Sequence, residues 1–444
     1  MAVSLGFHIV LACFGLAFPV LIYVAHRRGI RGEGDPVALG LARRWSKVAA
    51  VLFAIGAVSG TVLSFEMGML WPGLMGRYGD VIGLPFALEG IAFFLEAIFI
   101  GVYLYGWDRL PGRTHLLTLV PILVSGTVGT FCIVSVNGWM NAPTGFRLDP
   151  TTGNPTNVRP VAAMFNRAAL LEFAHLWLGA FMLVGFLVAS VYAWGLRRGR
   201  DDAHHRLGFK IAIGFAAGAA LIQPISGHLA GQRLTRQQPA KLAAMELADH
   251  TETHAPLVIG GLRIGGRVRY GLRIPGVSSF LATNHFDGKV IGLNDVPVSE
   301  QPPVNLVHIT FQSMVGIGSL LAMFALWYWW IRRRGRDLLL APRFLKAAVV
   351  AGPAAVVALE LGWVTTEVGR QPWVVDHLLT VRQAVTTGHS PLYTLPAIVV
   401  LYAALSVGAV VILRSMARRW RDGAELDLPT PYGPPARVGE ARVP

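Results

Sequence analysis

The sequence predicts an all-α integral membrane protein with about nine transmembrane helices. Of its 444 residues, 53% are hydrophobic and only 14% are charged, whereas soluble domains have roughly 25% charged residues. The mean hydropathy is +0.51. The apolar residues also gather in runs of about 20, which is the length that a helix needs to cross a bilayer.

The predicted membrane helices follow one another along most of the chain. They lie at approximately residues 5–26, 48–70, 83–106, 115–136, 168–195, 208–230, 304–331, 344–368 and 392–414. The net charge of +14 comes from short basic clusters beside these runs. Such a pattern is typical of membrane topology, so we expect a lipid bilayer and no nucleic acid among the partners.

The basic clusters predict the orientation of the chain. Arginine and lysine residues gather after the first, third, fifth, seventh and ninth runs; the largest clusters contain Arg27, Arg28, Arg31, Arg43, Arg44 and Lys47, and Arg332, Arg333, Arg334, Arg336, Arg343 and Lys346. Because basic loops stay in the cytoplasm, the N-terminus is predicted outside and the C-terminus inside. Residues 231–303, between the sixth and seventh helices, then form a long outer loop.

These features divide the chain into two parts. Residues 1–421 are predicted to form one membrane domain. Residues 422–444 are rich in proline, glycine and charge and are predicted to be a disordered cytoplasmic tail. The two cysteines, Cys13 and Cys132, both lie in apolar runs, which disfavours a disulfide framework and a cysteine-ligated metal.

Two carboxylates lie inside the third apolar run, PFALEGIAFFLEAIFIGVYLYGWDR. Glu89 and Glu96 are seven residues apart, which is two helical turns, so both point to the same side. An ionisable side chain in hydrocarbon costs roughly 2.5–3.5 kcal/mol on insertion scales. We therefore expect both to face a cavity, a metal, a proton path or a buried partner.

Other polar residues lie at similar depths in separate runs. At the predicted orientation, the outer half of the membrane contains five potential metal ligands: His8, Glu89, His175, Met314 and Glu367. Glu96 and Glu360 lie nearer the middle. A histidine and a methionine are a common axial pair for haem iron, and the absence of CxxCH indicates a non-covalent haem. Taken singly, each residue also fits hydrogen-bonded or apolar packing.

Several stretches of the sequence resemble subunit I of the bd-type quinol oxidases. They are GDVIGLPFALEGIAFFLEAIFIGVYLYGWDRL, VNGWMNAPTGF, EFAHLWLGAFM, KLAAME, FQSMVGIG and GWVTTEVGRQPW. The resemblance extends from about residue 5 to residue 414. It implies a respiratory terminal oxidase of the bacterial cytoplasmic (inner) membrane, which oxidises ubiquinol or menaquinol at the outer face and reduces dioxygen to water with charge separation. It also implies a second subunit and, in some relatives, a small single-span subunit.

The resemblance assigns haem ligands by motif. His175 in EFAHL and Met314 in FQSM match the axial pair of a low-spin haem b. His8 in GFHI, Glu89 in LEG and Glu367 in TEVGRQPW match the ligands of two high-spin haems. One of these is a haem b and the other a haem d or a further haem b. How the three ligands divide between the two haems stays open.

The resemblance also assigns residues around the haems and the quinol. Lys241 and Glu246 in KLAAME match residues that are linked to quinol oxidation in the outer loop. Glu96 in FFLEA matches the proton-path carboxylate. Trp363 and Arg370 match residues around the haems.

The sequence departs from the family pattern at three places. Seven residues separate Glu89 from Glu96, where the family usually has eight, and this rotates one carboxylate by about 100° relative to the other. Gln312 replaces an arginine two residues before Met314, so the low-spin haem is expected to lose a nearby cation. FEMGMLW stands where FEFGTNW is more usual.

Two other functions are compatible with parts of the sequence. A membrane haem b protein that transfers electrons without reducing oxygen would keep His175 and Met314. A cation transporter would use Glu89, Glu96 and Glu360. The chain lacks the pair of glycine- or proline-broken helices in two matching halves that is typical of transporters.

Overall fold

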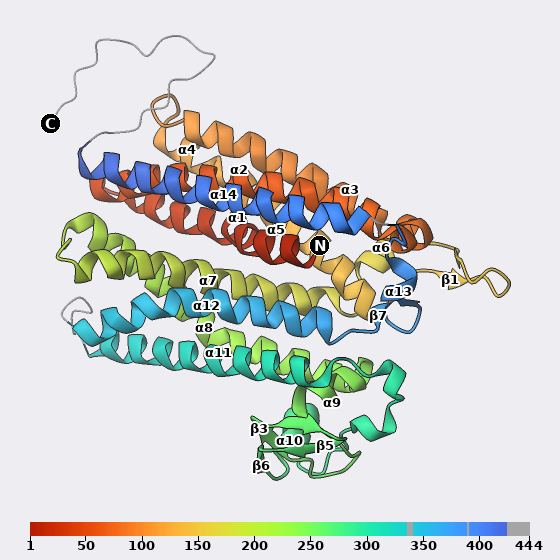
Figure 1. Cartoon of the computed structure of the whole chain (residues 1–444). Helices are drawn as coiled ribbons and strands as arrows, with labels where there is room; N and C mark the ends of the chain where they lie inside the picture. Colours follow the sequence, from red (N-terminus) through yellow and green to blue (C-terminus); the bar gives the residue numbers. More distant parts are fainter. Residues whose placement is uncertain (335–340, 389, 424–444) are drawn as a thin grey trace.

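The computed structural model describes residues 1–334, 341–388 and 390–423. Within these residues, nine helical segments are long and apolar enough to cross a membrane, and they run side by side (Figure 1). They are α1 (Ala2–Gly29), α2 (Pro36–Leu70), α3 (Pro72–Tyr105), α4 and α5 together (Gly112–Leu117 and Leu119–Asn141), α7 (Ala169–Arg197), α8 (Ala203–Gln237), α11 (Val304–Arg333), α12 (Pro342–Val368) and α14 (Ser390–Arg421). The predicted all-α class and the number of membrane helices are confirmed. Most of the predicted tail, residues 424–444, lies outside the described residues.

Two of the helices begin well before the predicted membrane runs. The α2 helix starts at Pro36, and its N-cap Asp35 accepts a hydrogen bond from the backbone N–H of Ala38 at 3.1 Å. The α3 helix starts at Pro72 directly after Trp71. Proline in the first turn and an aspartate cap both favour a helix start, so these helices extend beyond the purely apolar segments.

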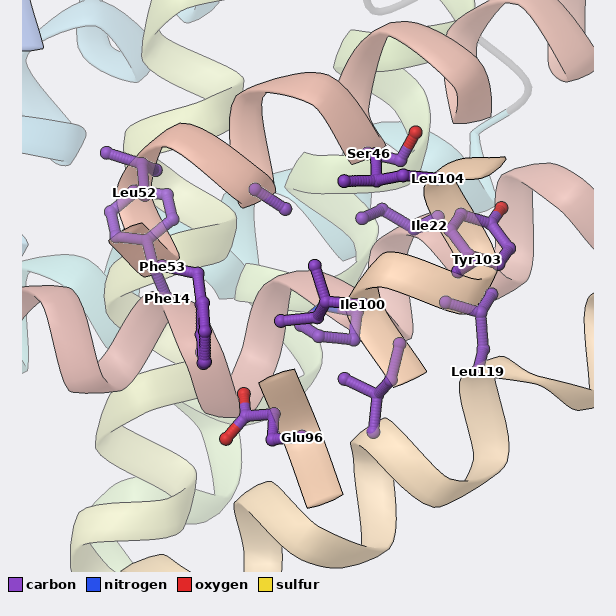
Figure 2. A pocket seen from close by; sticks show the side chains of 14 residues that line it. Phe14, Ile22, Ser46, Leu52, Phe53, Glu96, Ile100, Tyr103, Leu104 and Leu119 are labelled. Atoms are coloured by element: carbon purple, nitrogen blue, oxygen red, sulfur yellow. The ribbon is translucent and has the colours of Figure 1, made fainter. Parts of the chain in front are cut away.

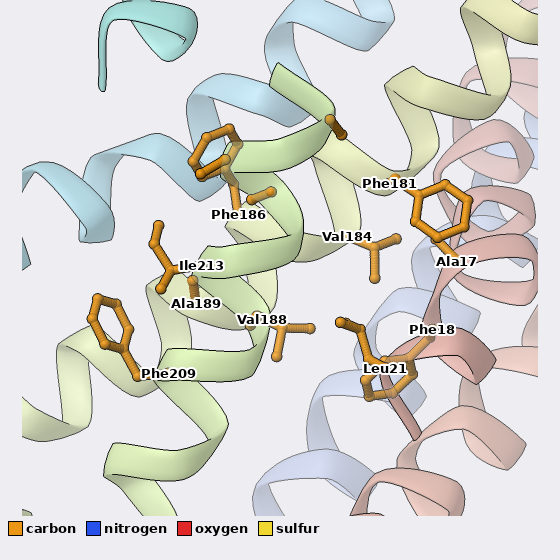
Figure 3. Close-up of a cluster of buried hydrophobic side chains, with 14 of the residues drawn as sticks. Ala17, Phe18, Leu21, Phe181, Val184, Phe186, Val188, Ala189, Phe209 and Ile213 are labelled. Carbon is orange, nitrogen blue, oxygen red and sulfur yellow. The ribbon is translucent and has the colours of Figure 1, made fainter. Parts of the chain in front are cut away.

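The long helices form two groups of four. The first bundle contains α1, α2, α3 and α5, and the second contains α7, α8, α11 and α12; α14 packs on α1 and α2. The bundles meet where α1 and α5 contact α7. Phe18 and Leu21 of α1 lie near Val184 and Val188 of α7 in the continuous apolar core (Figure 3).

The basic ends of the helices all lie at one end of the molecule. The C-terminal turns of α1, α7, α11 and α14 each contain arginine, and these turns are at the left in Figure 1. The hairpins and the short helices other than α4 gather toward the opposite end (Figure 1). Which of the two ends faces the cytoplasm stays a prediction from the positive-inside rule.

The connections at the opposite end are ordered. The segment between α5 and α7 contains the antiparallel pair β1 (Arg147–Leu148) and β2 (Pro155–Thr156), followed by α6 (Pro160–Met164). The segment between α8 and α11 contains α9 (Pro239–Glu246), the antiparallel pairs β3–β6 (Leu257–Ile259, Leu272–Ile274) and β4–β5 (Leu262–Ile264, Arg267–Arg269), α10 (Val277–Thr283), η1 (Leu293–Asp295) and η2 (Val298–Glu300). After α12 come β7 (Trp373–Val375), β8 (Leu379–Thr380) and α13 (Val381–Ala384).

The long segment between α8 and α11 is fastened to α11. Both ring nitrogens of His308 face backbone oxygens, that of Met245 at 2.8 Å and that of Gly260 at 2.9 Å. One turn further along, the side-chain amide of Gln312 accepts from the N–H of Gly260 at 2.7 Å and donates to the carbonyl of Val258. Gln312 therefore fixes the β3–β4 region to the helix that contains Met314.

Candidate functional site

The His175 ring is oriented by a serine on the neighbouring helix. Its Nδ1 lies 3.0 Å from Ser226 Oγ, and the serine hydroxyl itself donates to the carbonyl of Gln223 at 2.8 Å. Because the hydroxyl proton is used in that bond, Ser226 accepts from the Nδ1–H of His175. The lone pair is then on Nε2, which is the arrangement of a histidine that binds a metal.

The His8 ring is oriented in the same way. Its Nδ1 lies 2.9 Å from Ser59 Oγ, and Ser59 donates to the carbonyl of Gly56 at 3.0 Å. In both cases the serine follows the histidine by 51 residues and is followed by a glycine. A β-carbon on Gly60 would lie 3.0 Å from the His8 ring, so the glycine makes room for the imidazole.

Other buried histidines are held differently. Both nitrogens of His308 face carbonyl oxygens, which leaves neither as a free ligand. His26 Nδ1 is hydrogen-bonded to Tyr103 Oη at 2.9 Å, and His115 Nε2 to the backbone oxygen of Tyr103 at 2.7 Å. Among these five histidines, His8 and His175 are the ones whose Nδ1 is bonded to a serine hydroxyl.

Met314 lies in the same bundle as His175. Its sulfur is 2.8 Å from the position that a β-carbon would take on Gly362 of α12, so the thioether needs a glycine opposite it. Beside His175, the amide nitrogen of Gln223 is 3.3 Å from both ring nitrogens, and Gln223 Oε1 is buried with no hydrogen-bond partner among the described residues. An imidazole, a thioether and an unpaired polar atom fit a haem iron site.

The two carboxylates of α3 face the bundle interior, as predicted. Glu89 Cγ is 4.0 Å from the position of a β-carbon on Gly129 of α5. Glu96 Oε1 lies 3.3 Å from such a position on Gly15 of α1, and 3.7 Å from that on Gly126 of α5. Seven-residue spacing therefore places both carboxylates on the side of α3 that packs against α5.

Glu367 is held in a polar network at the end of α12. It forms an ion pair with Arg370 at 2.6 Å and accepts from the amide of Asn137 on α5 at 2.8 Å. Arg370 is buried, and it reaches Asn141 Oδ1 at 3.4 Å. The network joins α12 of the second bundle to α5 of the first. Glu89 and Glu367 thus both approach α5, whereas His8 contacts α2.

Lys241 and Gln238 at the start of α9 contact this network. Lys241 Nζ donates to the carbonyl of Thr366 at 3.0 Å, and Gln238 donates to Asn141 at 3.2 Å. Burial, with the nearby charge of Arg370, lowers the pKa of Lys241 to about 8. The structure therefore brings Lys241 close to Arg370 and to the neighbour of Glu367.

Glu246, at the other end of α9, is buried without a counter-charge. Burial raises its pKa to about 7, and its Oε2 has no hydrogen-bond partner in the described parts of the chain. A cleft of about 270 Å³ opens at the start of α9. Its lining includes Lys241, Arg370, Trp373, Asp376 and His377, and burial raises the pKa of Asp376.

Trp363 and Glu360 lie where α12 meets the start of α1. Trp363 Cζ3 is 3.9 Å and Glu360 Oε2 is 3.2 Å from the position of a β-carbon on Gly6, two residues from His8. Among the described residues, no three histidine, cysteine, aspartate or glutamate side chains gather in a group that could hold a metal ion.

Sequence reasoning did not identify the residues that orient the predicted ligands. These are Ser59, Ser226, Asn137, Asn141 and Gln223. One signal was present: a Ser-Gly pair follows each candidate histidine at the same distance. Glu66, in the unusual FEMGMLW stretch, is also buried and accepts a hydrogen bond from Ser4 at 2.9 Å.

Known proteins resemble this chain over nearly its whole length. The family described as cytochrome bd terminal oxidase subunit I matches residues 1–420. A Bacillus subtilis (strain 168) protein, described as a candidate cytochrome bd menaquinol oxidase subunit I, is 36% identical over 92% of this chain and 93% of its own. Subunit 1 of a cytochrome bd ubiquinol oxidase of the same organism is 30% identical, over 88% of this chain and 85% of its own.

A solved structure agrees with the fold. The bd oxidase structure from Geobacillus thermodenitrificans matches with a TM-score of 0.88 at 36% identity, covering 94% of this chain and 96% of the other. The nine candidate membrane helices of the described residues therefore belong to a fold that this structure shares. The chain belongs to the cytochrome bd terminal oxidase subunit I family, whose members are quinol oxidases.

Proposed function

We propose that this chain is the haem-binding subunit of an electrogenic terminal oxidase in the bacterial cytoplasmic membrane. It oxidises quinol at the outer face and reduces dioxygen to water. The observation that carries the proposal is the pair of histidines, His8 and His175, whose Nδ1 atoms are each bonded to a serine hydroxyl. In each bundle, Nε2 is then the nitrogen whose lone pair a haem iron would bind.

In the second bundle, His175 and Met314 would hold a low-spin haem b. A haem with two protein ligands transfers electrons, and one with an open position binds dioxygen. His8, Glu89 and Glu367 would hold the two high-spin haems, a haem b and a haem d or further haem b. Arg370 pairs with Glu367, and Trp363 lies where α12 meets α1 beside His8.

Electrons enter at the outer loop, residues 231–303. The α9 helix places Lys241 beside the end of α12, and Glu246 Oε2 has no hydrogen-bond partner among the described residues. A carboxyl with a pKa of about 7 is suited to accept a proton as the quinol is oxidised. The quinol is a ubiquinol or a menaquinol.

Protons for water formation come from the basic end of the molecule. Glu96 lies between that end and the predicted haem ligands, and we assign it to proton delivery. Electron entry and proton uptake on opposite sides make turnover electrogenic. A second subunit, with or without a small single-span subunit, covers apolar residues such as Ile91, Phe94 and Ile98, which are exposed on α3.

The test is a set of absorption spectra of the purified complex with all its subunits. Reduced-minus-oxidised spectra count the haem types, and carbon monoxide difference spectra report a haem with an open position. His175→Ala should remove the low-spin signal, and His8→Ala should remove one high-spin signal. His285→Ala, on the exposed part of the loop, is the matched control.

The spectra also separate the competing functions. A wild-type complex with haem but without carbon monoxide binding or quinol-driven oxygen consumption would be an electron-transfer protein. A complex without haem would contradict the proposal altogether. Loss of the same signal in His8→Ala and His175→Ala would contradict the assignment of one haem ligand to each bundle.

A further inference from the structure

A small cavity lies beside Glu96 between α1, α2, α3 and α5. Its volume is about 30 Å³, which is enough for roughly two waters. Most of the side chains that line it are apolar, and Figure 2 shows Glu96, Ser46 and Tyr103 among them. Glu96 is only 9% exposed, and its Oε1 has no hydrogen-bond partner within the described residues. An unpaired carboxylate oxygen at this cavity needs water as its partner.

Tyr103 lies at the basic end of the same cavity. It follows Glu96 by seven residues on α3, so both side chains lie on one side of the helix, about 10.5 Å apart along its axis. Tyr103 is buried, and its hydroxyl is hydrogen-bonded to His26 Nδ1 at 2.9 Å. The cavity thus connects a carboxylate at one end with a tyrosine–histidine pair at the other.

His26 lies close to the charged surface at the basic end. Its ring is 5.0 Å from both the Trp107 and the His115 rings. Asp108, next to Trp107, is largely exposed and forms an ion pair with Arg43 at 3.0 Å. Trp107 and His115 thus lie beside His26, and Trp107 is next in the chain to the exposed Asp108.

We propose that His26, Tyr103 and the cavity form the inlet of the proton route to Glu96. A protonated His26 gives its Nδ1 proton to the Tyr103 oxygen, while the hydroxyl proton of Tyr103 moves to a cavity water and then to Glu96. The chain resets when the Tyr103 hydroxyl turns back toward the cavity and the His26 ring turns so that its unprotonated Nδ1 takes the next proton from the surface and then returns. Ser46 donates its own proton to the carbonyl of Arg43 at 2.8 Å, so its oxygen remains free to accept from the water.

The inference rests on the proposed oxidase function and is tested in the complete complex, reconstituted in liposomes. Tyr103→Phe removes the hydroxyl and keeps the ring. Ala49→Leu fills the cavity from α2 and leaves Tyr103 and Glu96 in place. Tyr328→Phe is the matched control, because Tyr328 is equally buried on α11 and bonded to Arg332 at 3.2 Å.

Proton uptake and quinol-driven oxygen consumption should both fall at least about tenfold in Tyr103→Phe and in Ala49→Leu. The solvent isotope effect on uptake should increase, and the rate at which quinol reduces the haems in the absence of oxygen should stay unchanged. A purely structural defect would slow haem reduction as well. Tyr328→Phe should match the wild type.

Three outcomes would overturn the inlet. Wild-type proton uptake in both Tyr103→Phe and Ala49→Leu would exclude the route. Slow uptake in Ala49→Leu alone would exclude a role for Tyr103 in it. Slowing of equal size in Tyr328→Phe would make the effect non-specific. A wild-type complex without oxygen consumption would instead overturn the proposed oxidase function, so the two failures are distinguishable.

Discussion

Each of the two four-helix bundles orients a histidine by a hydrogen bond to a serine, but the two bundles place different side chains around that histidine. In each, a histidine near the start of the first helix is bonded to a Ser-Gly pair on the second helix, 51 residues later. In each, a potential haem ligand on the third helix is followed after 14 residues by a buried tyrosine: Glu89 by Tyr103, and Met314 by Tyr328.

The matched spacing makes the differences informative. Seven residues after Glu89 the first bundle has Glu96, whereas the second has Leu321 seven residues after Met314. Eighteen residues after His8 the first bundle has His26; eighteen residues after His175 the second has Ala193. Leu321 and Ala193 are buried. At these matched positions the first bundle has the titratable Glu96 and His26 and the second has apolar residues, so we assign proton uptake to the first bundle.

The connections between the second and third helices show the reverse difference. In the first bundle, Trp71 alone joins α2 to α3. In the second bundle, residues 238–303 separate α8 from α11, and they contain Lys241 and Glu246. The second bundle therefore has the additions expected for electron entry at the outer end. The Glu367–Arg370–Asn141 network joins the two bundles.

The largest effect is expected when Glu96 of the first bundle is replaced by leucine, the residue that the second bundle has at the matched position, Leu321. Glu96→Leu should lower quinol-driven oxygen consumption by roughly 100-fold or more, because a proton-carrying group in such a path contributes about 10²–10⁴-fold. The complex should still assemble with unchanged haem spectra, since leucine suits an apolar site. Oxygen electrode rates and spectra of the same preparation measure both.

A polar substitution at the matched position of the second bundle is the control for that prediction. Leu321→Gln places a polar side chain at the matched position of the second bundle, where no proton path is expected. It should not lower proton uptake selectively. A selective loss of uptake in Leu321→Gln, or full turnover in Glu96→Leu, would contradict the division between the bundles.

The two serine–histidine hydrogen bonds should act independently of each other. Ser226→Ala removes the acceptor of the His175 ring, and Ser59→Ala that of the His8 ring. Loss of such a partner typically lowers metal affinity 10–100-fold. We expect Ser226→Ala to deplete the low-spin haem and Ser59→Ala to deplete one high-spin haem.

Haem content measured from spectra after detergent dilution checks this. Ser64→Ala, an exposed serine on α2 whose hydroxyl bonds its own helix at 3.2 Å, should retain all haems. Depletion of both haem classes by either of the two serine variants would show that the bundles are not independent.

The network between the bundles should contribute to stability. Arg370→Gln leaves Glu367 with only the Asn137 amide, and a lost hydrogen bond to a charged group costs about 1.5–3 kcal/mol. We expect a lower thermal midpoint of the complex and a weaker high-spin signal. Arg267→Gln, an exposed arginine of β5, should change neither. An unchanged thermal midpoint for Arg370→Gln would mean that the network does not stabilise the contact between the two bundles.

Much of the fold could be predicted from the sequence, because a membrane helix is recognised from a long apolar run and the charges beside it, and both are local features of the chain. The nine helices were therefore identified. The early starts of α2 and α3 were missed, although Asp35, Pro36 and Pro72 are helix-start signals, because the first turns are too polar to count as membrane segments.

The candidate site was only partly predictable. The sequence identified His8 and His175, but Ser59 and Ser226 are 51 residues away, and the repeated Ser-Gly spacing was the one signal that pointed to them. Gln312 was interpreted only as the loss of a cation, whereas in the structure it fastens the outer loop at Gly260. Tertiary partners of this kind depend on how distant helices meet, which hydropathy does not report.

The smallest predicted effect concerns pH and sharpens the assignment of electron entry to the second bundle. Burial raises the pKa of Glu246 to about 7, whereas an ordinary glutamate titrates near 4.3. Only the ionised form, which dominates above the pKa, can accept a proton from the quinol. The rate of haem reduction by quinol should therefore rise as pH increases through about 7, by up to tenfold per unit below it. Glu246→Gln should remove this rise of the rate with pH, and Glu252→Gln, on the exposed loop, should keep it.

Glu96 belongs to the other bundle, so Glu96→Leu should also keep the rise of the haem-reduction rate with pH. If Glu96→Leu removed that rise, quinol oxidation and proton uptake would be coupled, although we propose that the two bundles separate them.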